Sequence, residues 1–466
     1  MRRKKQAVIL IHGIGEQRPM QTLRSFVEAV WSTDESVKSS EAIHTDAKGE
    51  ESGLFSKPDR IADHFELRRL ITTTNKKKVT TDFFEYYWAH RLEGTRIAHV
   101  LGWSKRLLMR SPKTLPPALK GTWYVLIGLA LLILSLGVVA LVNEGSLIRN
   151  TALSAALSLA VAWFITPLVL NIVGDAARYL DPAPGNIASR QAIRQAGVIM
   201  LEELHNRQAY DRIILVGHSL GSVIAFDILT HAWPRFNVIR KEDWASTPRA
   251  IALNKMEKML QDSSPPLDKK DFRQQQRRLL AEQQRNGNAW LVTDLITLGS
   301  PLTYAEVLLA RDKAELKSKQ HDRELPSCPP KTETKMLKPT SDEGGVEPEH
   351  EDDLPEQAKE SKEDSQIKQF ISYPTVNKHK RVLHHAAVFG VTRWTNLYFP
   401  TKGIVWGDFI GGPVAPQFGE GIKDIPVQTS QRRGFLSHTL YWRSKDLSGA
   451  PEHIQTLRQA LNLLDN

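Results

Sequence analysis

The stretch IILVGHSLGSVIAFDIL, residues 213–229, constrains the fold more than any other part of the chain. A β-branched apolar run leads into Gly-His-Ser-Leu-Gly, and an apolar run of helical character follows it. In a sharp strand-to-helix turn the serine takes strained backbone angles, and glycine is needed where a Cβ has no room. Gly217 and Gly221 therefore indicate that Ser219 is held at such a turn. The alternative is an ordinary turn in which Ser219 caps the helix.

Segments of strand and helix character alternate through most of the remaining chain. We expect strands at 7–11, 65–72, 79–87, 213–216, 291–298 and 394–399. We expect helices at 20–31, 187–206, 219–231 and 452–464, and a further helix that begins within GSPLTYAEVLLA. Such alternation predicts an α/β fold, with a mostly parallel sheet and helices on both of its faces.

Two stretches without a charged residue, 123–142 and 151–174, interrupt this pattern. Each is long enough to cross a bilayer core, which needs about 20 apolar residues, and only NEGSLIRN separates them. The leading flank is rich in lysine and arginine and the connection holds only Arg149, so both flanks are expected in the cytoplasm. The sequence thus predicts a transmembrane helical hairpin in the inner (cytoplasmic) membrane, with the bilayer as a partner. A pair of buried core helices is the alternative.

The predicted hairpin divides one domain into segments. Residues 317–368 are rich in Lys, Glu, Asp, Ser and Pro and nearly lack aromatic residues, so we expect a disordered insertion there. The charged helix expected at 268–285 is interpreted as a solvated face or as a basic helix lying on anionic lipid. The expected organisation begins with the start of the domain at 1–120 and the hairpin at 121–174. The strand-to-helix turn at residues 217–221, here called the elbow, and the charged helix lie in 175–316, followed by the insertion at 317–368 and the end of the domain at 369–466.

Composition narrows the classes of partner and cofactor. The formal charge of +10 makes anionic surfaces plausible, but the basic residues are scattered and no nucleic-acid-binding motif is present. The single cysteine, Cys328, excludes a disulfide within the chain. His384 and His385 have no third ligand at a useful spacing, so a packing or surface role is favoured over a metal site. No metal or organic cofactor is expected. The oligomeric state does not follow from the sequence.

A serine hydroxyl is a weak nucleophile and needs a base, which an acid must orient. In strand–turn–helix serine enzymes these groups follow in the chain order serine, acid, histidine. GDFIGGPVAP supplies Asp408 as the acid, and LSHTLYW supplies His438 as the base. Asp424, in GIKDIPV, is the competing acid and could equally be a turn residue. The sequence therefore predicts Ser219, His438 and Asp408 as a catalytic triad.

The reaction also needs two backbone donors for the developing oxyanion. Leu220, directly after the nucleophile, is expected to supply one N–H. Ile14 is expected to supply the other, because the glycines of His12-Gly13-Ile14-Gly15 let its N–H turn toward the pocket. His12 is interpreted as a residue that braces this loop, and His218 as a fill-in residue of the elbow.

These motifs, VILIHGIGEQ, LVGHSLGSVIAFDIL, LITLGSPL and SHTLYW, resemble the lipase and esterase branch of the α/β-hydrolase superfamily. The elbow and its helix also resemble intracellular phospholipases of the DDHD type. The resemblance implies an α/β-hydrolase fold and a serine hydrolase that cleaves carboxylic esters, including lipid esters, beside the membrane. An acyltransferase or thioesterase with the same triad, and a non-catalytic membrane scaffold, remain as alternatives.

Overall fold

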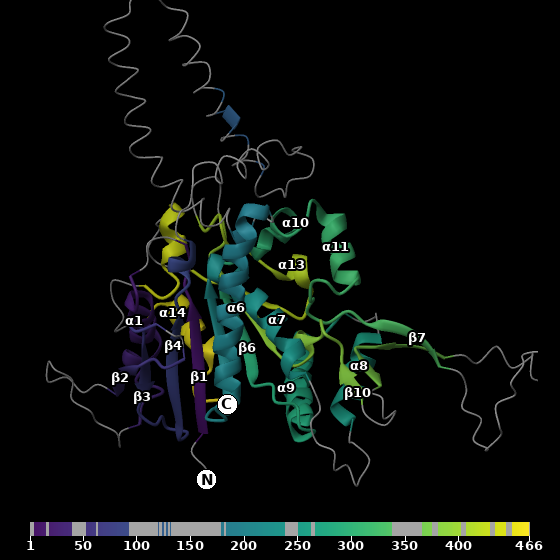
Figure 1. Ribbon diagram of the computed structural model, residues 1–466, viewed down its shortest axis with the longest axis horizontal. Helices are drawn as coiled ribbons and strands as arrows, with labels where there is room; N and C mark the ends of the chain where they lie inside the picture. Colours follow the sequence, from purple (N-terminus) through teal and green to yellow (C-terminus); the bar gives the residue numbers. More distant parts are fainter. Residues whose placement is uncertain are drawn as a thin grey trace, which may run out of the picture.

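Eight strands form one sheet in the order β12-β11-β6-β5-β1-β4-β3-β2 (Figure 1). The strands are β1 (Lys4–Ile11), β2 (Leu54–Pro58), β3 (Arg68–Thr72), β4 (Val79–Tyr86), β5 (Arg212–His218), β6 (Val292–Leu298), β11 (Arg393–Tyr398) and β12 (Lys423–Pro426). The structure is a computed structural model that describes residues 4–14, 18–39, 53–61, 64–92, 179–180, 183–237, 250–261, 266–337, 366–374, 381–401, 407–428, 434–443 and 450–465, with the single positions 120, 124, 127, 128 and 131.

The strands from β12 to β4 run parallel, and only β3 and β2 are antiparallel to their neighbours. β1 lies between β4 and β5, although 125 residues separate the end of β4 from the start of β5, so segments from both sides of the predicted hairpin share the sheet. The carboxyl ends of β1, β5, β6 and β11 therefore meet at one edge. That edge is where loops of an open parallel sheet form binding and catalytic sites.

Alternate residues of the central strands face opposite sides of the sheet, because side chains in a strand have a period of two. In β1, Ala7, Ile9 and Ile11 belong to one apolar cluster, whereas Val8 and Leu10 belong to a second. The first cluster includes side chains from α6 (Pro184–Asn206), α7 (Leu220–Phe236), α8 (Ile251–Gln261) and α9 (Lys269–Arg285). The second includes side chains from α1 (Gln21–Val27) and α14 (Glu452–Leu461). Helices thus cover both faces (Figure 1), as the alternation of segments predicts.

Shorter elements surround this sheet. The remaining helices are η1 (Glu28–Ser32), η2 (Ala89–Leu92), η5 (Pro301–Tyr304), α10 (Ala305–Leu308), α11 (Lys313–His321), η8 (Val388–Gly390), α13 (Ala415–Phe418) and η9 (Gly434–Thr439). Two antiparallel strand pairs, β7 (Glu333–Leu337) with β8 (Gln366–Phe370) and β9 (Ser372–Pro374) with β10 (Arg381–Leu383), lie outside the main sheet.

The prediction of a transmembrane hairpin is corrected by the structure. None of the described helices is long and apolar enough to span a membrane. The longest of them, α6, carries Arg190, Arg194, Glu202 and Glu203 along its length, so it is a surface helix with one buried side. The stretches 123–142 and 151–174 lie outside the described residues except at 124, 127, 128 and 131. The prediction rested on hydropathy and on the charge of the flanking residues, and the hairpin and the membrane localisation do not stand.

The predicted disorder of 317–368 is wrong for its first part. Residues 317–321 belong to α11, and the chain continues through described residues to the end of β7. Cys328 is fully buried, its N–H donates to the carbonyl of Phe418, and its carbonyl accepts from the N–H of Gly421. The charged composition did not indicate these contacts, because a few buried residues are enough to order a segment that is otherwise polar. Residues 338–365 lie outside the described part of the chain.

The charged helix expected at 268–285 is α9. Asp268 caps its start by accepting hydrogen bonds from the N–H groups of Lys270 and Asp271. One face is buried through Phe272 and Leu279, together with three glutamines of the same helix. α9 is therefore an amphipathic helix with one buried and one solvated face; Lys269, Lys270, Arg277 and Arg278 are exposed, whereas Arg273 is partly buried.

Candidate active site

Ser219 lies between the end of β5 and the start of α7, at the carboxyl edge of the sheet. Its backbone has a φ of 53° and a ψ of −129°, a region that non-glycine residues rarely occupy. Two hydrogen bonds hold this conformation: the N–H of Ser219 donates to the carbonyl of Leu298, and the hydroxyl of Ser222 donates to the carbonyl of Ser219. A strained residue that its surroundings fix in this way is typical of functional sites.

The two elbow glycines occupy positions where a side chain would collide with backbone. A Cβ on Gly217 would lie 2.5 Å from Cα of Ser222. A Cβ on Gly221 would lie 2.3 Å from the carbonyl oxygen of Ile11 at the end of β1. The absence of side chains lets α7 begin directly against β1, so the glycines of the motif serve the close packing that the sharp turn needs.

The HGIG loop lies against the serine. A Cβ on Gly13 would come within 2.9 Å of the Ser219 Cβ, so this loop and the nucleophile candidate are direct neighbours. Among the described residues, neither the N–H of Leu220 nor that of Ile14 donates a hydrogen bond. Leu220 is the first residue of α7, and the free N–H groups of a helix start carry partial positive charge. Both predicted oxyanion donors thus belong to segments at the serine.

Asp408 and His438 are paired. The Nδ1 of His438 lies 2.9 Å from the Oδ2 of Asp408. The hydroxyl of Tyr441 donates to the same Oδ2 at 2.7 Å, and the N–H groups of Ile410 and Gly411 donate to Oδ1 at 2.8 and 3.0 Å. Asp408 is fully buried, so these donors replace the water that a carboxylate needs.

The charge of Asp408 follows from these contacts. Burial alone would raise the pKa of its carboxyl, but the hydrogen bond and charge of His438, with the donors of Gly411 and Tyr441, outweigh burial. The net pKa of Asp408 lies below its ordinary value, so the group is an anion at neutral pH. An anion beside Nδ1 selects the tautomer that carries the proton on Nδ1 and leaves Nε2 as the base.

The competing acid, Asp424, has a different set of partners. Its Oδ1 accepts from the amide of Asn396 at 2.7 Å and from the N–H of Val414, and its Oδ2 accepts from the N–H of Ala415. These contacts join β12 to β11 and fix the start of α13. No described hydrogen bond or ion pair connects Asp424 with His438, so the geometry favours Asp408 as the acid.

The Nε2 of His438 is buried and has no hydrogen-bond partner among the described residues. Its ring centroid lies 4.9 Å from that of His218, the residue next to Ser219. No described hydrogen bond joins Nε2 to the Ser219 hydroxyl. Such contacts are often long in the absence of substrate and tighten when it binds. The imidazole nitrogen that a general base would use therefore lies at the elbow with its lone pair unoccupied.

Two further residues support this site and were not assigned a role from the sequence. His218 forms a hydrogen bond through Nε2 with the backbone carbonyl of His438 at 2.8 Å. Burial lowers the pKa of His218 to about 3, so the ring stays neutral and donates this bond. Tyr441 connects Asp408 to β11, since its hydroxyl also accepts from the N–H of Phe399. Tyr441 lies in the SHTLYW motif, three residues after His438. This position in the motif is the only feature of the sequence that could have pointed to a role for Tyr441.

His12 and His384 have partners of their own. The Nδ1 of His12 contacts the carbonyl of Gly13 at 2.8 Å, and its ring stacks on Trp88. Burial lowers the pKa of His12 to about 4, which fits a neutral residue that braces the loop. His384 contacts the carbonyl of Lys331 through Nε2. No group of three or more potential ligands for a metal ion occurs in the part of the chain that the structure describes.

The fold and site therefore define an α/β protein in which a strained serine adjoins a partly buried histidine that is paired with a buried aspartate. Comparison with models of protein families, with curated proteins and with solved structures finds no match to this chain.

Proposed function

We propose that the protein is a serine hydrolase that cleaves carboxylic esters through an acyl-enzyme. The observation that carries this proposal is the contact between His438 Nδ1 and Asp408 Oδ2, made beside a serine held at a φ of 53°. A structural serine in a turn does not require a buried, anion-paired imidazole as its neighbour. The resemblance of the motifs to lipases and esterases of the α/β-hydrolase superfamily supports the same reaction class.

In the proposed reaction, the Ser219 oxygen attacks the ester carbonyl carbon while its proton passes to Nε2 of His438. The imidazolium that forms is stabilised by Asp408 at Nδ1. The carbonyl oxygen becomes an oxyanion and accepts hydrogen bonds from the N–H groups of Leu220 and Ile14. Collapse of this intermediate breaks the bond to the alcohol, which takes the proton from Nε2 and leaves an acyl-serine. Water then repeats the sequence, which releases the carboxylic acid and restores Ser219.

The buried acid–base pair suits this chemistry. Asp408 is held as an anion by several donors, so it keeps one orientation when the imidazole becomes charged. His218 is neutral and donates to the backbone of His438, which positions the base without adding a second positive charge beside it. These features lower the reorganisation that charge separation would otherwise need.

A panel of p-nitrophenyl esters of increasing acyl length tests the proposal. The full-length protein is expected to show a burst of nitrophenol equal to the enzyme concentration whenever deacylation is slower than acylation. Added methanol or a thiol then distinguishes hydrolysis from acyl transfer, because an acyltransferase would form the new ester or thioester in preference to the acid. Ser219→Ala protein that is folded but equally active on the panel would overturn the proposal.

A further inference from the structure

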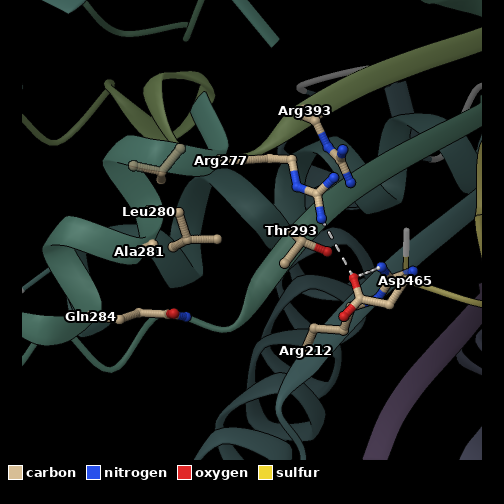
Figure 2. Close-up of a pocket in the computed structure, with 9 residues that line it drawn as sticks. Arg212, Arg277, Leu280, Ala281, Gln284, Thr293, Arg393 and Asp465 are labelled. Atoms are coloured by element: carbon tan, nitrogen blue, oxygen red, sulfur yellow. Dashed lines mark hydrogen bonds and ion pairs between the residues drawn. The ribbon is translucent and has the colours of Figure 1, made fainter. Parts of the chain in front are cut away.

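A small pocket lies at the starts of three neighbouring strands (Figure 2). Ser219 lies at the opposite edge of the sheet, after the end of β5. Arg212 begins β5, Thr293 is the second residue of β6, and Arg393 begins β11. Arg277 of α9 closes one side, and Asp465, just after α14, closes another. The volume of about 90 Å³ is several times what one water molecule needs. This pocket is separate from the candidate active site.

Positive charge exceeds negative charge around this pocket. Arg393 pairs with the buried Asp294 at 2.7 Å, and Arg212 pairs with Asp465 at 2.6 Å. Arg277 is 3.8 Å from the same oxygen of Asp465, and Lys4 is 2.9 Å from the other oxygen. The two carboxylates thus face three arginines and a lysine.

A fourth arginine adds to this excess. Arg273 of α9 donates to the carbonyl of Trp394 and the hydroxyl of Thr395, both neutral partners. Burial, together with the positive charge of nearby Arg393, lowers the pKa of Arg273. The charge of Asp294 acts in the opposite direction, so Arg273 is a further cation near Arg393 that one carboxylate only partly offsets.

The pocket also holds unused donors. The Nε atoms of Arg212 and Arg393 are buried and have no hydrogen-bond partner among the described residues. The side chain of Arg212 is only 6% exposed and that of Arg393 only 13%. A buried donor without a partner costs free energy, and the cost is larger for a charged group. Both arginines line the pocket, so a hydrogen-bond acceptor inside it would give these Nε donors the partner they lack.

We propose that this pocket binds a phosphate group, with Arg277 and Arg393 as donors and Asp465 as an internal carboxylate that competes for the same arginines. Guanidinium groups match the oxygens of phosphate and carboxylate in the same way. The pocket already contains one carboxylate, that of Asp465, and the charge of the surrounding arginines still exceeds it. A phosphate monoester carries about 1.5 to 2 negative charges at pH 7 and three acceptor oxygens, which offsets the remainder.

A second, larger pocket of about 420 Å³ between α8 and α9 adjoins this one, because Arg277 and Ala281 line both. Its lining also includes the apolar Ile251 and Ala252 and the charged Arg278 and Glu282. A phosphate held at Arg277 could therefore be free, or could belong to an organic phosphate whose remaining part occupies the larger pocket. Both ligands share the phosphate group, but only the binding of an organic phosphate would depend on Arg278, which lines the larger pocket alone.

Calorimetric titration of the full-length protein with inorganic phosphate, at constant ionic strength maintained with chloride, tests the proposal. Saturable binding is expected, and Arg277→Gln should weaken it about tenfold or more, the usual effect of losing a charged hydrogen-bond donor. Lys270→Gln removes the same charge from an exposed position of α9 outside both pockets, and should change the affinity less than about twofold. Asp465→Asn should instead tighten binding, because the competing charge is lost.

Phenyl phosphate, titrated in the same way, distinguishes the sources. Equal affinities for the two ligands would assign the pocket to free phosphate. Tighter binding of phenyl phosphate, reduced by Arg278→Gln while inorganic phosphate is unaffected, would assign it to an organic phosphate. The proposal is overturned if phosphate shows no saturable binding, if Lys270→Gln weakens it as much as Arg277→Gln, or if Asp465→Asn weakens it in a protein whose circular dichroism is unchanged.

Discussion

The Nδ1 of His438 and the Oδ2 of Asp408 lie 2.9 Å apart, with both groups held at the carboxyl edge of the sheet. Asp408 follows β11, and its N–H donates to the carbonyl of Phe399. His438 belongs to η9, and its backbone carbonyl accepts a hydrogen bond from Nε2 of His218. Two loops that are 30 residues apart in sequence thus meet through this pair, and the contact of His218 with His438 joins them to the elbow.

Asp408→Asn should lower kcat/KM for a small ester by about three to four orders of magnitude, because the amide no longer selects the tautomer with a free Nε2. Asp424→Asn is the matched control, since it changes the same group 16 residues further along and removes contacts only to β11 and α13. Its activity should fall less than about tenfold. The assignment of the acid is wrong if Asp424→Asn is the crippling change.

Tyr441→Phe should shift the acid limb of the kcat/KM profile to higher pH. Without the tyrosine hydroxyl, Asp408 loses one of the donors that lower its pKa, and Oδ2 keeps more negative charge to stabilise the protonated imidazole of His438. Tyr304→Phe is the control, because its hydroxyl donates to the carbonyl of Phe409 rather than to Asp408. Loss of activity with an unmoved acid limb would mean that Tyr441 is only a packing residue.

Gly221→Ala should destabilise the protein by about 1–3 kcal/mol or more, because the new Cβ would meet the Ile11 carbonyl oxygen at 2.3 Å. Gly185→Ala introduces the same methyl group in the first turn of α6, where nothing lies within 4 Å, and should be neutral or slightly stabilising. Urea unfolding followed by circular dichroism compares the two variants. Equal stability of both would show that the elbow does not pack against β1 as described.

Acid should destabilise the protein partly through His205, which is buried against Phe236 and whose pKa burial lowers to about 4. An unfolded histidine with a pKa of about 6.5 binds more protons than the folded one between these values. The contribution of His205 is therefore present in full above pH 6.5 and is lost as the pH falls toward 4, by about 3 kcal/mol at most.

The His205→Gln variant should accordingly lose less of its stability between pH 7 and pH 4 than the original protein. Thermal midpoints at each pH provide the comparison. The buried Glu85, whose pKa burial raises to about 7, acts in the opposite direction but is common to both proteins. An unchanged pH dependence in the variant would show that His205 is not buried as a neutral ring.

The elbow could be predicted because its signals are local. β-branched residues, two glycines and a helical apolar run identify a strand, a turn and a helix within residues 213–229, and the structure has β5, Ser219 and α7 there. The strand β12 was missed because it is a short edge strand, KDIP, with no alternation of polar and apolar residues. The choice between Asp408 and Asp424 needed the path of the loops, which no local pattern encodes.

The errors have a related origin. The hairpin was predicted from hydropathy without any information on the neighbours of those residues. The disorder of 317–337 was predicted from charge, whereas buried Leu316 and Cys328 order that segment. The role of Tyr441 depends on a contact with a residue 33 positions away, so it emerges only once the chain is folded.

The most direct test of the central claim is covalent labelling with a fluorophosphonate, followed by mass spectrometry of the digested protein. The label should be found on the peptide that contains Ser219, and it should be absent from Ser219→Ala. Ser222→Ala, which removes one of the two hydrogen bonds that hold Ser219, should still be labelled at Ser219 but more slowly. A label on another residue, or labelling that survives in folded Ser219→Ala protein, would contradict the account.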